Sequence, residues 1–319
     1  MTATLTIVRA GILTTVQDLG RPRWGAFGVP PSGAMDAFAA RAANRLVGNA
    51  PGAACLELTG AGAALTVDEA RLIAAAGADL DGQITGDADG DGAARSLPPW
   101  QPALLAPGAT LRFAHRRGGA RAVLAIAGGL RVDAVLGSAA TDVTNHLGGW
   151  QGRPLRAGDR LPLGPAAPAS GPARAISADT VAAVYGDPFR IRFLPAPGAT
   201  PALAAWLVET PFTVTPQSNR AGFRLRAEGG APPLDGPPAE RLSEPIAPGT
   251  IQLPPDGQPI LLMADRQTIG GYAVAGHVIA ADLPRAAQLW PGDRFHFAAV
   301  APAEARRLLR QQAALERAP

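Results

Sequence analysis

The feature of this sequence that most constrains its fold is an internal repeat. The pattern of "LTIVRAG" at residues 5–11 returns as "IRFLPAP" at 191–197, a shift of 186 (191 minus 5). At the same shift "PPSGAMD" at 30–36 meets "PQSNRAG" at 216–222, and "RLIAAAGADL" at 71–80 meets "GQPILLMADR" at 257–266. Several matches in the same order predict a duplicated unit, because chance similarities do not keep a fixed spacing.

Each copy consists of short apolar runs separated by glycine and proline. The chain of 319 residues has 38 Gly and 32 Pro and is 47% hydrophobic, so it has enough apolar side chains for a large core. Such runs are typical of strands in a closed or sandwich-like β structure. Helical patterns occupy few segments: 35–47, 199–209 and the tail from Pro302. We therefore expect a mainly β protein made of two related barrels.

The repeat also predicts the domain organisation. We expect a first domain at residues 1–175 and a second at 176–319. The first would include an excursion at 114–163 that has no counterpart in the other copy. The stretch rich in Pro, Ala and Ser at 164–175 is the expected linker.

The charged residues exclude several kinds of chemistry. The sequence contains no lysine, so its basic residues are arginines and four histidines. A chain without lysine cannot itself carry covalent biotin, form a Walker loop or make a Schiff base. Any carboxylate or phosphate that it binds must be held by arginine or by backbone N–H groups. The net charge of only +3, with acids and bases interleaved, argues against nucleic acid as a partner.

The single cysteine and the N-terminal segment indicate the compartment. Cys55 lies in the apolar run "AACLEL", so we expect it in the core, and one cysteine fits a reducing environment. The first residues show no charged-then-apolar signal pattern, and no apolar run is long enough to cross a membrane. We expect a soluble cytoplasmic protein without a membrane partner.

The two copies differ most in their polar residues. "PPSGA" at 30–34 in the first copy faces "PQSNR" at 216–220 in the second, and "ADLDG" at 78–82 faces "ADRQT" at 264–268. Since the first copy lacks these groups, the fold itself does not require them. We therefore predict a functional role for Arg266, Gln267 and Thr268, the alternative being a buried hydrogen-bonded network that closes the barrel end.

Long motifs resemble those of a known family. The stretch "GILTTVQDLGRPRWGAFGVPPSGAMDAFAARAANRLVGNAPGAACLELTG" at 11–60 resembles the opening of the biotin-dependent carboxyltransferase family, and "TPQSNRAGFRL" and "LSEPIAPGTIQLPPDGQPILLMADRQTIGGY" resemble its second half. The resemblance covers nearly the whole chain and implies two tandem cyclophilin-like β-barrels. This sequence departs from the family at Asn219, where an acid is common, and at Pro245 after Glu244.

The resemblance implies three alternative functions. The first is the C subunit of an ATP-dependent 5-oxoprolinase, which with a KipI-like B subunit and an A subunit would open 5-oxo-L-proline to L-glutamate, using ATP with Mg²⁺ shared with the partner. The second is transfer of a carboxyl group from carboxybiotin on a separate partner to an amide or urea-like acceptor. The third is a KipA-like, non-catalytic antagonist of a kinase inhibitor. Convergent arginines and carboxylates favour either enzyme, whereas exposed apolar residues along a barrel edge favour the binder.

Candidate site residues come mostly from the second copy. We expect catalytic roles for Glu244, Asp265 and Arg266, because carboxylates move protons or bind Mg²⁺ and arginine pairs with carboxylate or phosphate. The predicted substrate-binding residues are Gln217, Asn219, Arg220, Gln267, Thr268 and Tyr272, together with Gln17, Asp18, Arg21 and Ser32 of the first copy. For three of these a structural role is equally expected: Asp18 as a turn residue paired with Arg21, and Ser32 as the cap of the helix at 35–47.

Other polar motifs carry less chemistry. "DADGDG" at 87–92 imitates the start of a calcium loop, but Pro98 stands at the twelfth position where glutamate is needed, so we expect a hairpin turn. The four histidines show no metal-binding spacing, and we predict no metal site on this chain. His146, in "TNHLGGW", is a candidate acid or base, with a structural role favoured.

Overall fold

The computed structural model describes residues 3–86, 94–166, 175–234 and 242–317. The chain divides into two compact units. The first unit contains Met1–Arg21 and Ser32–Ala178, and the second contains Pro22–Pro31 and Asp179–Pro319. The boundary expected after residue 175 stays a prediction, because most of the expected linker at 164–175 lies outside the described residues. The "DADGDG" segment at 87–92, expected as a hairpin turn, also lies outside them.

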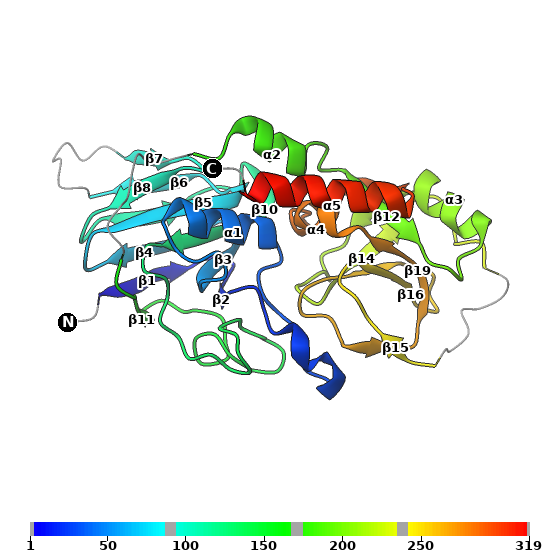
Figure 1. The fold of residues 1–319 in the computed structure, drawn as a ribbon, viewed down its shortest axis with the longest axis horizontal. Coiled ribbons are helices and arrows are strands. Elements are labelled where there is room, and N and C mark those ends of the chain that lie inside the picture. Colours follow the sequence, from blue (N-terminus) through cyan, green and yellow to red (C-terminus); the bar gives the residue numbers. More distant parts are fainter. Residues whose placement is uncertain (1–2, 87–93, 167–174, 235–241, 318–319) are drawn as a thin grey trace. The chain divides into compact units, whose positions relative to one another are not determined.

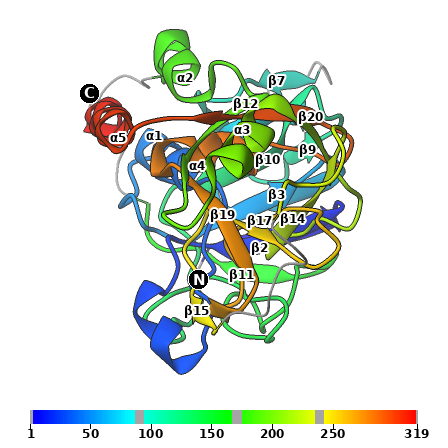
Figure 2. The ribbon, with the colours of Figure 1, turned by 90° about the vertical axis from the view of Figure 1, so that its right-hand side faces the viewer.

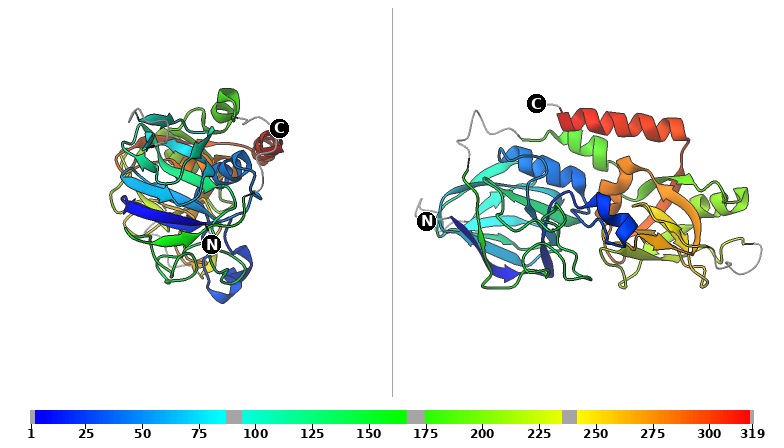
Figure 3. Two further views of the ribbon diagram at one scale, coloured as in Figure 1. Left: turned by 90° about the vertical axis from the view of Figure 1, so that its left-hand side faces the viewer. Right: turned by 60° about the horizontal axis from the view of Figure 1, so that its bottom comes forward.

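The first unit is built from two antiparallel sheets (Figure 1). The first sheet has the order β11 (Arg160–Pro162), β1 (Thr4–Ala10), β4 (Ala63–Val67), β9 (Thr110–Phe113), β6 (Gly82–Thr85) and β7 (Arg95–Leu97). The second has the order β2 (Leu13–Gln17), β3 (Cys55–Thr59), β10 (Gly118–Ile126), β5 (Arg71–Asp79) and β8 (Pro102–Leu105). The left view of Figure 3 shows these strands from another side.

The core of the first unit lies between its two sheets. Leu5, Leu65 and Leu111 from the first sheet and Leu58 and Leu124 from the second belong to one buried cluster. Such packing of two apolar faces is the main stabilising term in a sandwich. Helix α1 (Ala37–Leu46) lies against β5 and β10.

The segment at 114–163, expected as an excursion, supplies two strands of the first unit. Its strand β10 pairs with both β3 and β5, and β11 pairs with β1 at the edge of the other sheet. The apolar run "AVLAIA" explains the position of β10, because a strand with neighbours on both sides is buried. This segment is therefore part of the core of the unit.

The second unit contains a closed barrel of seven strands (Figure 2). Around the barrel the order is β12 (Arg190–Pro195), β19 (Ala273–Val278), β16 (Thr250–Leu253), β17 (Ile260–Leu262), β14 (Gly222–Ala227), β13 (Pro211–Val214) and β20 (Arg294–Ala299). A separate two-stranded ribbon joins β15 (Glu244–Pro245) to β18 (Ile269–Gly270). Four buried phenylalanines of the barrel strands contact one another, namely Phe193, Phe212, Phe295 and Phe297. Closure leaves the barrel without unpaired edges.

All three predicted helices are present. They are α1, α3 (Pro201–Glu209) and α5 (Pro302–Arg317), the last of which is the long red helix of Figure 3. The structure adds the shorter α2 (Ala178–Tyr185) and α4 (Leu283–Ala287), with 3-10 turns η1 (Pro22–Phe27) and η2 (Ala280–Asp282). These are too short for a clear apolar period in the sequence. In the described part of the chain, no helix combines the length and apolar character that crossing a membrane requires.

The mainly β architecture is confirmed, but the repeat is not preserved in strand pairing. The shift of 186 correctly sets β1 against β12, β4 against β16 and β5 against β17. However, β1 pairs directly with β4, whereas β19 lies between β12 and β16. The same shift sets helix α1 against strand β14. The sequence similarity between the two copies therefore marks the positions of several strands. The connections between strands decide which of them pair.

Candidate functional site

Two polar loops of the second copy meet at one end of the barrel. The loop after β17 carries Asp265 and Arg266, and the loop before β14 carries Arg220. Backbone hydrogen bonds join the loops: Asp265 N donates to Arg220 O at 3.0 Å, and Met263 N donates to Ala221 O at 2.9 Å. The structure therefore brings together the two segments in which the copies differ most.

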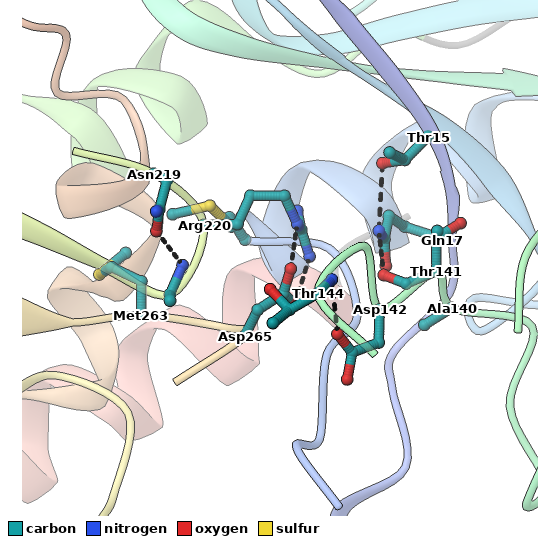
Figure 4. A network of polar contacts seen from close by, with 12 residues as sticks. Thr15, Gln17, Ala140, Thr141, Asp142, Thr144, Asn219, Arg220, Met263 and Asp265 are labelled. Atoms are coloured by element: carbon teal, nitrogen blue, oxygen red, sulfur yellow. Dashed lines mark hydrogen bonds and ion pairs between the residues drawn. The ribbon is translucent and has the colours of Figure 1, made fainter. Parts of the chain in front are cut away.

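Arg220 and Asp265 form a buried ion pair at the centre of this region (Figure 4). Arg220 Nε donates to Asp265 Oδ2 at 2.8 Å, and Arg220 Nη2 donates to Oδ1 at 3.1 Å. The two side chains are 5% and 4% exposed. A two-point pair of this kind fixes the orientation of both groups. It gives the predicted anion-binding guanidinium and the predicted catalytic carboxylate an intramolecular partner, so both functional roles remain predictions.

Arg266 is different, because its hydrogen-bond partners are backbone carbonyls. The residue is 8% exposed, and its guanidinium donates from Nε to Ile246 O at 3.0 Å and from Nη1 to Met263 O at 3.3 Å. No carboxylate of the described residues pairs with it. Burial lowers the pKa of Arg266 from 12.5 to about 10, so the group is still charged at neutral pH. A buried charge without a counter-ion is the electrostatic condition of an anion site.

The neighbouring amides form a short chain of contacts. Gln267 is exposed, and its Nε2 donates to Oε1 of the fully buried Gln252 at 3.2 Å. Ile246 N donates to Thr268 O at 2.9 Å, which attaches the β15–β18 ribbon to the "DRQT" loop. Gln252 is absent from the residues predicted from the sequence, although a glutamine inside the apolar strand "TIQL" is an unusual buried amide that could have indicated it.

The remaining predicted residues of the second copy lie at the surface. Gln217 and Glu244 are exposed, and Tyr272 is 47% exposed. Asn219 is also exposed, and its Oδ1 accepts hydrogen bonds from Ala221 N at 2.8 Å and from the next N–H along the chain at 3.4 Å. The amide of Asn219 therefore closes a local turn, which explains why a short polar side chain is suited to this position.

In the first unit, Gln17 and Asp18 belong to a structural network. Gln17 Nε2 donates to Thr15 Oγ1 at 3.1 Å and to Thr141 O at 3.0 Å (Figure 4). Asp18 accepts from Ser138 Oγ at 2.6 Å and from two backbone N–H groups. The structure thus gives Asp18 the role of a turn residue, with Ser138 as its side-chain partner.

Arg21 and Ser32 are buried in the same unit. The Arg21 guanidinium donates to the backbone carbonyls of Val135 and Ala140. The expectation that Ser32 caps the helix is wrong, because the N-cap is Asp36, whose carboxylate accepts from the N–H three residues further on at 2.9 Å. An aspartate directly before the first helical residue is the better cap, since its side chain reaches the third N–H of the helix.

Metal-binding geometry is not found in the described residues. No group of three or more His, Cys, Asp or Glu side chains converges in that part of the chain. The candidate acid or base His146 is exposed in a turn with φ of 53°, within the loop closed by the Asp142–Leu147 bridge.

Comparisons with known proteins agree with this fold. The family model for the carboxyltransferase domain, subdomains A and B, matches residues 27–299. The chain is 36% identical to the 5-oxoprolinase C subunit of Escherichia coli over 92% of its length and 90% of that protein. It is 33% identical to the 5-oxoprolinase C subunit of Haemophilus influenzae, over 93% of this chain and 91% of that one.

A solved structure extends the comparison to the coordinates. The crystal structure of the Kluyveromyces lactis urea amidolyase matches 99% of this chain with a TM-score of 0.89 and 25% identity, and the chain spans only 20% of that protein. The family model covers well over half of the sequence. This chain therefore belongs to the carboxyltransferase domain family, subdomains A and B.

Proposed function

We propose that this chain is the C subunit of an ATP-dependent 5-oxoprolinase, acting with a KipI-like B subunit and an A subunit. The proposal is supported by two relatives of that name at 36% and 33% identity, each matched over at least nine tenths of its length. The reaction would open 5-oxo-L-proline to L-glutamate with hydrolysis of ATP. The lactam oxygen would take the γ-phosphoryl group of ATP as ADP leaves. One water would then attack the activated carbon as the C–N bond breaks and the nitrogen takes up a proton, and a second water would release phosphate, so that two waters are consumed for each glutamate formed.

The observation that carries the proposal is the buried Arg266 without an acidic partner. A lactam is stabilised by resonance, so its oxygen must become a leaving group such as a phosphate before water attacks. Both the substrate carboxylate and a transferred phosphoryl group are anions that a guanidinium holds through two parallel hydrogen bonds. In this scheme Arg266 pairs with one of these anions.

The other predicted residues receive roles consistent with their positions. The Arg220–Asp265 pair positions the two loops, and the exposed Glu244 accepts a proton. The contacts to the substrate from the loop and ribbon come from Gln217, Gln267, Thr268 and Tyr272. ATP with Mg²⁺ would be shared with the partner subunit, since Mg²⁺ is commonly held by only one or two carboxylates together with the phosphates of the nucleotide.

A direct test is to co-express the chain with the A and B subunits and to assay ATP hydrolysis that depends on 5-oxoproline. We expect Arg266→Ala to lower this rate by roughly a hundredfold or more, as for loss of one transition-state contact. Arg224→Ala, at an exposed arginine of β14, is the matched control and should leave it unchanged. Equal rates for wild type and Arg266→Ala would show that the site is wrong.

The likeness to urea amidolyase supports carboxyl transfer as the second candidate. The carboxyl donor would be carboxybiotin on another protein, since this chain has no lysine for biotin attachment. This candidate predicts no ATP hydrolysis by the co-expressed subunits, and carboxylation of a urea-like amide once a biotinylated carrier is added.

The third candidate, a KipA-like binder, is supported by exposed apolar residues near the ribbon. Leu242 is 91% exposed, Ile269 is 58% exposed and Tyr272 is 47% exposed. Exposed apolar side chains are typical of surfaces that bind another protein. This candidate is favoured if the wild-type complex catalyses no reaction and the Arg266→Ala variant still binds its partner proteins normally.

A further inference from the structure

Gln252 holds its side-chain amide in one fixed orientation. The residue lies in β16 of the barrel and is fully buried. Its Oε1 accepts the hydrogen bond from Gln267 Nε2, so its own Nε2 must face the other way. Within the described part of the chain, Nε2 has no hydrogen-bond partner.

An amide donor in this state is costly for the fold. A buried N–H group without an acceptor destabilises a protein by about 1–3 kcal/mol. Nearly all buried polar groups in native structures are paired, so each exception needs its own explanation. A methionine has nearly the same shape as glutamine and would avoid this cost. The retained amide therefore suggests an acceptor that comes from outside the fold.

The surroundings of Nε2 are tightly packed. A Cβ placed on Gly270 would lie 2.7 Å from Gln252 Nε2, 3.3 Å from Ile246 Cδ1 and 3.4 Å from Gln267 Nε2, so the bare Cα of Gly270 lies close beside the amide and a larger residue would not fit there. The carbonyl of the same Ile246 accepts from Arg266 Nε. The unpaired Nε2 of Gln252 and the guanidinium of Arg266 therefore both lie near Ile246.

We propose that Gln252 is a specificity residue, which donates its Nε2 hydrogen bond to the amide carbonyl of a small carboxylate substrate. This inference rests on the proposed function, in which Arg266 holds an anionic group of the same substrate. A cyclic amide that carries a carboxylate offers a carbonyl oxygen as the acceptor for Gln252 and a negative charge as the partner for Arg266. The class of ligand is therefore an anionic lactam.

Access to the amide requires movement of its cover. The β15–β18 ribbon has only two residues in each strand, and Ile269 on it is 58% exposed. Strands this short contribute little stability by themselves. The ribbon opens to admit the carbonyl oxygen beside Gly270, and Gln267 remains bonded to Oε1 so that the donor keeps its direction.

The test uses the co-expressed complex of the A, B and C subunits in which Gln252→Met has been introduced. Binding of 5-oxo-L-proline is measured by calorimetry and its turnover by ATP hydrolysis. We expect Kd and KM to rise about tenfold, the value of one hydrogen bond of about 1.4 kcal/mol, with kcat changed less than twofold. Cyclopentanecarboxylate keeps the ring and the carboxylate but lacks the carbonyl, so its inhibition constant should not change.

A matched control separates this role from a structural one. Gln312 is also a buried glutamine of the second unit, and its Nε2 donates to Ala281 O at 3.2 Å. Gln312→Met should leave Kd, KM and kcat unchanged. If the Gln252 amide served only the fold, Gln252→Met would alter the melting temperature without changing Kd, which would overturn the inference.

A variant of Arg266 separates the inference from the proposed function. Arg266→Met should weaken 5-oxo-L-proline and cyclopentanecarboxylate together, because both carry the carboxylate. If Arg266→Met weakens the binding of 5-oxo-L-proline and Gln252→Met does not, the inference is contradicted but the proposed function stands. Wild-type complex that does not bind 5-oxo-L-proline contradicts the proposed function and the inference with it, whereas Arg266→Met that binds both ligands normally contradicts the inference.

Discussion

Arg220 and Asp265 are joined by two hydrogen bonds of 2.8 and 3.1 Å in a buried pair that connects two loops at the end of the barrel of the second unit. The two residues lie 45 apart in sequence, and Asp265 directly precedes Arg266 along the chain. The geometry of the pair therefore sets where the backbone of the proposed anion-binding residue lies. Its energetic role can be measured separately from any effect on activity.

Removing either partner of this pair should be strongly destabilising. Asp265→Asn or Arg220→Met leaves a buried group without its partner, so each should lower the free energy of unfolding by about 3–5 kcal/mol. The double variant should lose clearly less than the sum of the two, because it leaves neither charge uncompensated. Urea denaturation of all four proteins measures this coupling. Strictly additive losses would show that the two groups do not stabilise each other.

The cap of α1 provides a paired test of two buried polar side chains. Asp36→Ala removes the acceptor for Ala39 N and should lower stability by about 0.5–2 kcal/mol. Ser32→Ala removes a buried hydroxyl that has no hydrogen-bond partner among the described residues, so it should stay within about 0.5 kcal/mol of wild type. The melting temperatures of the two variants measure these losses of stability. A larger loss at Ser32 would contradict the assignment of the cap.

The single thiol of the protein should be unreactive in the folded state. Burial, followed by the charges of Glu57 and Asp18, raises the pKa of Cys55 far above its ordinary value. Its Sγ also contacts Gln17 O at 3.2 Å in the first unit. Since the thiolate is the reactive form, a disulfide reagent at neutral pH should modify native protein at least about a hundredfold more slowly than unfolded protein. Rapid stoichiometric labelling without unfolding is the contrary result.

His277 should make stability depend on pH. Burial lowers the pKa of His277 below 6.5, and its Nδ1 lies 3.1 Å from Thr250 Oγ1. The unfolded chain therefore takes up a proton first as the pH falls, so this contribution to stability is complete above 6.5 and is lost below it. His277→Gln should flatten the fall in melting temperature between about pH 7 and pH 5. His296→Gln, at an exposed position of β20, is the matched control; the same flattening there would contradict the assignment.

The sequence by itself determined the mainly β architecture, the three longer helices and the family. Apolar runs of strand length, with glycine and proline between them, are local patterns, so they can be recognised without knowledge of the tertiary structure. The contrast between "ADLDG" and "ADRQT" also points to Arg266 from the sequence alone. These are properties of residues and of their near neighbours in the chain.

Only the tertiary structure decided which polar groups are paired. In the sequence Arg220 and Arg266 look alike, yet Asp265 pairs with Arg220, while Arg266 donates to backbone carbonyls. Nor does the sequence single out Gln252, because the surroundings of its amide are set by Gln267 in the loop after β17 and by Gly270 in β18. Hydrogen bonds and ion pairs are made between groups far apart in sequence, so their presence or absence depends on how the chain closes the barrel.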